Sequence, residues 1–120
     1  MTQIDFTHNI KLLDLINSAC KEIRQALAEH LEHTTSAQYK DDIDKDMVTL
    51  ENLKHIVAAV KKDIKSEKVG ASTELLLRIA ANDFKNRLAQ IPEKKALRKE
   101  IMITLKEVHH NMQQQTVRET

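Results

Sequence analysis

Residues 10–31 read IKLLDLINSACKEIRQALAEHL, and this stretch decides the fold class. Its apolar side chains recur at steps of three and four residues, which is the spacing of one face of an α-helix. Asp5 or Thr7 can cap the start of this helix, and a polar run over 34–36 interrupts its end. The recurring positions are Leu13, Ile16, Cys20, Ile23, Leu27 and His30, widened by Ile10 and Leu31.

A second helix of the same periodicity follows, and its start has two possible positions. Ser36 can cap a long helix, or Asp41 and Asp42 can cap a shorter one. Its end is marked by several lysines, which suit the negative end of a helix dipole, and then by Gly70. We expect Gly70 to take the left-handed conformation that commonly ends a helix.

Pro92 divides the second half of the chain into two further helices, the first of them capped by Ser72 or Thr73. A proline ends the preceding helix and suits the first position of the next one. One long helix kinked at Pro92 is the alternative. Short connections predict an all-α, antiparallel up-down-up-down four-helix bundle forming a single domain over 1–120. The expected helices cover about 7–33, 36–68 or 41–68, 72–91 and 92–113, with a frayed tail over 114–120.

The composition excludes several classes of protein. One Gly and one Pro cannot supply the turns of an all-β fold or a glycine-rich phosphate loop. The lone Cys20 excludes a disulfide framework and a cysteine-based zinc module, and we expect no metal and no cofactor. No apolar stretch approaches the length of a transmembrane helix, and no targeting segment is apparent. A cytoplasmic location without membrane association is therefore expected.

The net charge of +1 conceals two halves of opposite sign, −4 over residues 1–60 and +5 over residues 61–120. A basic cluster opens the fourth expected helix, where cations oppose the helix dipole. One interpretation is that the cluster neutralises acids at 41–46, which the bundle brings to the same end. The alternative is a contact site for an acidic partner or nucleic acid. A pI near 7.9 and 2% aromatic residues disfavour nucleic acid. The cluster consists of Lys94, Lys95, Arg98 and Lys99.

Two runs of three consecutive apolar residues, at 75–77 and at 101–103, are wider than the single stripe that a helix needs to bury. Each triplet covers about 200° of its helix, so part of it is expected to face outward. Such a surface commonly marks a partner site, although a wide core is the alternative. We therefore expect a non-enzymatic protein-interaction module, such as an adaptor, chaperone, inhibitor or immunity-type protein, binding another protein or itself as a homodimer. The expected partner strip comprises Leu75, Leu76, Leu77, Ala81, Met102 and Ile103.

A small helical ribonuclease is a further alternative. Arg24 and His30 have an Arg-x5-His spacing that resembles HEPN-type ribonucleases, and this resemblance implies RNA cleavage. The two positions lie about 120° apart around the helix, which does not favour joint action. We expect His30 to pack in the apolar seam, with pH sensing as the alternative. Cys20 lies in the same seam and is expected to be a buried, unreactive thiol.

Overall fold

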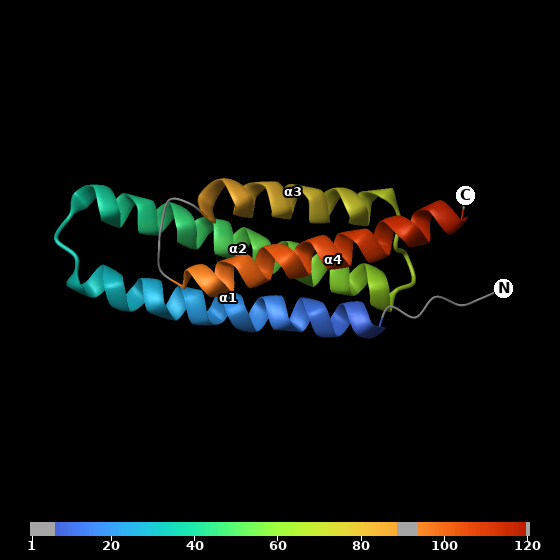
Figure 1. Ribbon diagram of the computed structural model, residues 1–120, viewed down its shortest axis with the longest axis horizontal. Helices are drawn as coiled ribbons and strands as arrows, with labels where there is room; N and C mark the ends of the chain where they lie inside the picture. The colour runs from blue at the N-terminus through green and yellow to red at the C-terminus, as the bar shows by residue number, and fades with distance from the viewer. Residues whose placement is uncertain (1–6, 89–93, 120) are drawn as a thin grey trace.

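The computed structural model describes residues 7–88 and 94–119, and this part of the chain consists of α-helices and the short connections between them. Figure 1 shows the helices lying side by side along the long axis of a molecule that measures 59 × 21 × 20 Å. No strand occurs within the described residues, so the prediction of an all-α fold is confirmed. The helices are α1 (Thr7–His33), α2 (Ala37–Lys65), α3 (Ala71–Leu88) and α4 (Lys95–Glu119).

The first two helices follow the sequence pattern closely. The bounds of α1 are those predicted, and α2 begins at the earlier of its two expected starts. Ser36 has extended backbone geometry, and its hydroxyl accepts a hydrogen bond from the backbone N–H of Tyr39 at 3.2 Å. This bond satisfies one of the orphan donors of the first helical turn, so the longer alternative is correct.

The end of α2 differs from the prediction. The helix stops at Lys65, and Glu67, with φ 57°, takes the left-handed position expected of Gly70. The backbone N–H of Lys68 bonds to the carbonyl of Asp63 at 2.9 Å, and that of Glu67 to the carbonyl of Ile64 at 3.2 Å. These two bonds form a Schellman motif, which satisfies the last carbonyls of the helix.

Gly70 instead precedes α3, so the prediction that Ser72 or Thr73 occupies the capping position is wrong. The hydroxyl of Thr73 accepts a hydrogen bond from the N–H of Gly70 at 3.3 Å and donates one to Asp63 Oδ2 at 2.7 Å. Thr73 is fully buried. It therefore ties the start of α3 to the end of α2 from inside the first turn.

The connection between α3 and α4 contains Pro92, which lies outside the described residues. On its far side Lys94 has φ 56°, and α4 begins at Lys95, later than the predicted residue 92. The helix continues to Glu119.

Each helix packs against two neighbours, in the pairs α1–α2, α2–α3, α3–α4 and α1–α4, which is compatible with a bundle. All four helices contribute to one hydrophobic core. No helix in the described ranges is long and apolar enough to cross a membrane. The largest fully buried apolar side chains are Phe84, Leu13, Ile16, Ile23, Leu27, Ile43, Leu50, Leu53, Leu77, Ile101 and Leu105.

Candidate functional site

The predicted partner strip on α3 and α4 does not form one outward surface. Leu77 is fully buried and Met102 is 8% exposed, so the expectation that these two side chains face outward is wrong. Leu76 and Ala81 are half-buried against the core. The middle of α3 faces the core through Leu77, which shares a helical face with other buried residues at steps of three and four. The core alternative therefore accounts for most of the strip.

The exposed members of the strip are Leu75 and Ile103, at 52% and 65% exposure, and they lie on different helices. Leu75 is four residues from Ile79, which is 43% exposed, so the two share the outer face of α3. Ile103 on α4 is instead three residues from Glu100, which lines a groove between α4 and α1. This groove is the candidate site.

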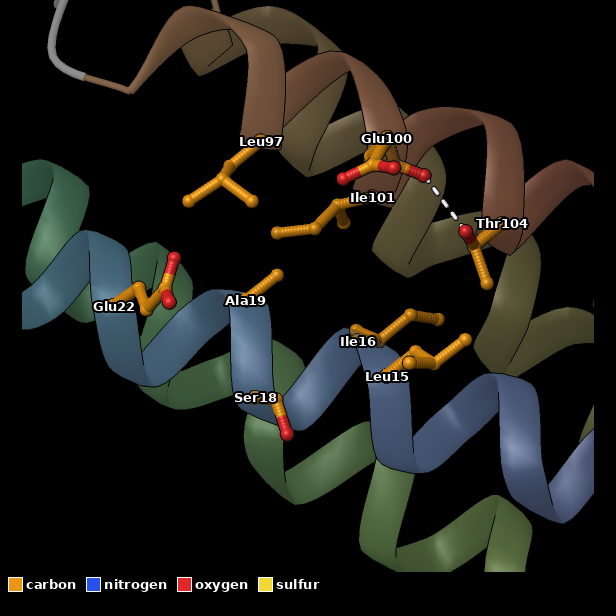
Figure 2. A pocket seen from close by; sticks show the side chains of 9 residues that line it. All are labelled: Leu15, Ile16, Ser18, Ala19, Glu22, Leu97, Glu100, Ile101 and Thr104. Carbon is orange, nitrogen blue, oxygen red and sulfur yellow. Dashed lines mark hydrogen bonds between the residues drawn. The ribbon is translucent and has the colours of Figure 1, made fainter.

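The groove has a volume of about 210 Å³, and its lining is largely apolar. Figure 2 shows Leu97 and Ile101 extending from α4 toward Ala19 and Ile16 on α1. The hollow exists because Ala19 ends at its Cβ atom, where a larger side chain would fill the space between the helices. The lining residues are Leu15, Ile16, Ser18, Ala19, Glu22, Leu97, Glu100, Ile101 and Thr104.

An exposed leucine lines the groove on α1, and an exposed isoleucine on α4 neighbours one of its lining residues in the chain. Leu15 on α1 is 62% exposed and Ile103 on α4 is 65% exposed, the two highest values among the large hydrophobic residues that the structure describes. Leu15 and Thr104 line the same groove, and Ile103 follows Met102 and precedes Thr104 on α4, with its side chain about 100° around the helix from that of Thr104. Sequence reasoning missed Leu15. Its signal was the surplus of apolar residues in LLDLI at 12–16, which is wider than one helical stripe.

Carboxylates form part of the rim. Glu22 on α1 and Glu100 on α4 are exposed, and both line the groove. Neither side chain has an ion-pair partner within the described part of the chain. The groove therefore combines apolar walls with negative charge that is available to a cation.

The basic cluster at the start of α4 is divided between surface and core. Arg98 is fully buried, and its guanidinium donates to both carboxylate oxygens of Asp46, at 3.0 and 2.6 Å. The expectation that Arg98 belongs to a contact surface is therefore wrong, whereas its pairing with an acid at 41–46 is confirmed. The pair is buried rather than exposed, so removing one of its partners lowers the free energy of unfolding more than removing a partner of a surface ion pair. Lys94, Lys95 and Lys99 remain exposed.

The residues considered for catalysis contact other side chains of the bundle or are buried in its core. Arg24 forms an ion pair with Glu51 at 3.1 Å. His30 is exposed, with its ring centroid 4.7 Å from that of Tyr39, so the expectation that it packs in the apolar seam is wrong. Cys20 is buried as predicted, and burial raises its pKa to about 12, with Arg24 partly opposing the shift. A thiol of this kind is a poor nucleophile.

A second hollow lies near the end of α2. It has a volume of about 330 Å³ and is lined by Lys61, Lys62 and Lys65 together with Asn17. Lys61 is paired with Asp14 at 2.6 Å, and lysines at this end of a helix stabilise its dipole. Within residues 7–88 and 94–119, no group of three or more His, Cys, Asp or Glu side chains is arranged to hold a metal ion.

Comparisons with protein-family models, with curated proteins and with solved structures give no match for this chain. The groove between α1 and α4 and its rim are therefore the features from which a function can be inferred.

Proposed function

We infer that the four helices run antiparallel, in an up-down-up-down bundle. Three cross-helix contacts support this topology, because each joins the beginning of one helix to the later part of its neighbour. Asp14 of α1 pairs with Lys61 of α2. Similarly, His30 near the end of α1 lies against Tyr39 at the start of α2, and Glu74 of α3 lies 3.3 Å from His109 of α4.

We propose that the chain is a non-enzymatic protein-interaction module, of the adaptor, chaperone, inhibitor or immunity type, and that the groove between α1 and α4 is its docking surface. The observation that carries this proposal is that Leu15, one of the two most exposed large hydrophobics described, lines an apolar hollow, while the other, Ile103, is the chain neighbour of the lining residue Thr104. Apolar surface that is rimmed by polar groups is typical of protein-binding sites. A cytoplasmic location belongs to the same proposal, because the free thiol of Cys20 is stable in a reducing compartment.

Nucleic-acid binding through the basic cluster is less well supported. Burial of Arg98 leaves Lys94, Lys95 and Lys99 as its exposed cations. Binding to phosphates by lysines falls steeply as salt increases, whereas docking on apolar surface does not. Measuring complex formation between about 50 and 500 mM salt therefore separates these alternatives.

Site-specific photo-crosslinking tests the proposed surface. A benzophenone amino acid at Ser18, which lines the groove, is expected to crosslink a protein in the native cell. The matched control places the same group at Val48, which is 59% exposed on α2 and outside the groove. Crosslinks at Ser18 that disappear in a Leu15→Asp variant support the proposal. Equal crosslinking at Ser18 and Val48, or none at Ser18, contradicts it.

A further inference from the structure

On the side of α1 that borders the groove, a basic, an apolar, a small polar and an acidic side chain follow one another along the helix. Lys11, Leu15, Ser18 and Glu22 follow one another at steps of four, three and four residues, so they lie along one side of the helix. All four are exposed, and Ala19 beside Ser18 is half-buried. Lys11, like Glu22, has no ion-pair partner among the described residues.

Two copies of this side of α1 are complementary to each other when one of the helices runs in the opposite direction. If two α1 helices meet antiparallel about a two-fold axis near positions 16 and 17, residue 11 of one copy lies opposite residue 22 of the other. Leu15 of each copy then lies opposite Ser18 and Ala19 of the other copy. An exposed leucine meets a hollow bordered by small side chains, and a lysine meets a glutamate. Each contact occurs twice, as two-fold symmetry requires.

We propose that the occupant of the groove is a second copy of this chain, docked with its α1 antiparallel to the first. This inference rests on the proposed function, because it names the partner for the same surface. Leu15 of each copy enters the hollow over Ala19 of the other, and Lys11 pairs with Glu22 at both ends of the contact. Ile103 extends the apolar area on the α4 side, where its exposure leaves it free to contact the other copy.

The dimensions of the molecule allow such a dimer. A stable interface buries about 800 Å² on each partner. The molecule is 59 Å long and about 20 Å wide, so a contact of this size fits on one of its sides. The contact is closed by its two-fold axis, so it yields dimers rather than extended polymers.

Charge reversal at the two ends of the contact tests the arrangement. Lys11→Glu and Glu22→Lys each replace two attractive pairs by two repulsive ones, so each variant alone is expected to dimerise at least tenfold more weakly. The double variant, and an equimolar mixture of the two single variants, restore attraction at every pair and should recover the dimer. Lys21→Glu is the matched control, because Lys21 is an exposed lysine of α1 that lies about 100° around the helix from Glu22 and about 120° from Leu15, outside the proposed contact.

Analytical ultracentrifugation at about 100 µM chain measures the outcome, since dimerisation depends on concentration. The wild type is expected to sediment as a dimer, and Leu15→Glu as a monomer with unchanged helical circular dichroism. A monomeric wild type, or a mixture of single variants no more dimeric than each alone, overturns the inference. Crosslinking of Ser18 to a different protein, with a monomeric wild type, would overturn the homodimer but leave the proposed protein-binding function intact.

Discussion

Changing Asp46 to Ala should destabilise this protein more than changing any carboxylate on its surface. Asp46 is 1% exposed, and both of its carboxylate oxygens accept hydrogen bonds from Arg98, which is fully buried. The variant leaves a guanidinium in the core that cannot lose its proton. Removing one partner of a buried ion pair costs about 3–5 kcal/mol. A domain of ordinary stability has only about 5–15 kcal/mol to lose.

The assay is thermal and urea-induced unfolding of the wild type and the variant, each followed by circular dichroism at 222 nm. For a domain of this size, the loss corresponds to a decrease in Tm of roughly 12–20 °C, at about 4 °C per kcal/mol. Asp41→Ala is the control, because Asp41 pairs with Lys45 at the surface with 55% of its side chain exposed. Such a pair contributes less than about 1 kcal/mol.

A double variant distinguishes the loss of the negative charge beside the buried Arg98 from a general loss of packing. Asp46→Leu combined with Arg98→Met replaces both charges by apolar side chains, and similar replacements elsewhere were neutral or stabilising. We expect its stability to return to within about 1 kcal/mol of the wild type. The reasoning is refuted if Asp46→Ala costs no more than Asp41→Ala, or if the double variant is as unstable as Asp46→Ala.

Two further predictions concern the end of α2 and the buried thiol. Glu67→Gly should stabilise the fold by about 0.5–1 kcal/mol, because glycine takes the observed φ of 57° without steric cost, whereas Glu67→Ala should give no such gain in chemical denaturation. Burial raises the pKa of Cys20 from its ordinary value of 9.0 to about 12, so the folded state holds its proton where the unfolded chain has lost it. Relative to Cys20→Ala, the wild type should therefore lose stability as pH rises from about 9 toward 12, by about 1.4 kcal/mol per pH unit. A stability difference between these two chains that stays constant from pH 8 to 10.5 would contradict this sign.

Much of the secondary structure was predictable because it depends on neighbours in the chain. The apolar spacing and the Ser36 cap act within one or two turns, so they locate α1 and the start of α2 without tertiary information. The end of α2 was less predictable, because Gly70 suggested the left-handed position that Glu67 occupies. There the Schellman hydrogen bonds hold a non-glycine residue in a conformation that its own preference disfavours.

The candidate site was less predictable, because exposure depends on the neighbouring helices. Leu77 and Leu75 are equally apolar and two residues apart, yet one is fully buried and the other is 52% exposed. In the same way, an arginine is usually exposed, yet Arg98 is fully buried because it pairs with Asp46, which lies 52 positions away in the chain. The pattern of charges in the sequence predicts that these two groups meet, but at the surface rather than in the core.

The sequence by itself determined an all-α chain, the approximate extent of its helices and the opposite charge of its two halves. These properties follow from residue spacing and composition, which act locally. Tertiary structure alone decided which surplus apolar residues remain outside, and it created the groove. That groove requires the small side chain of Ala19 on α1 to lie across from Leu97 on α4, 78 positions later in the chain. The physical reason is that a hollow is a property of two packed surfaces, and neither helix contains it alone.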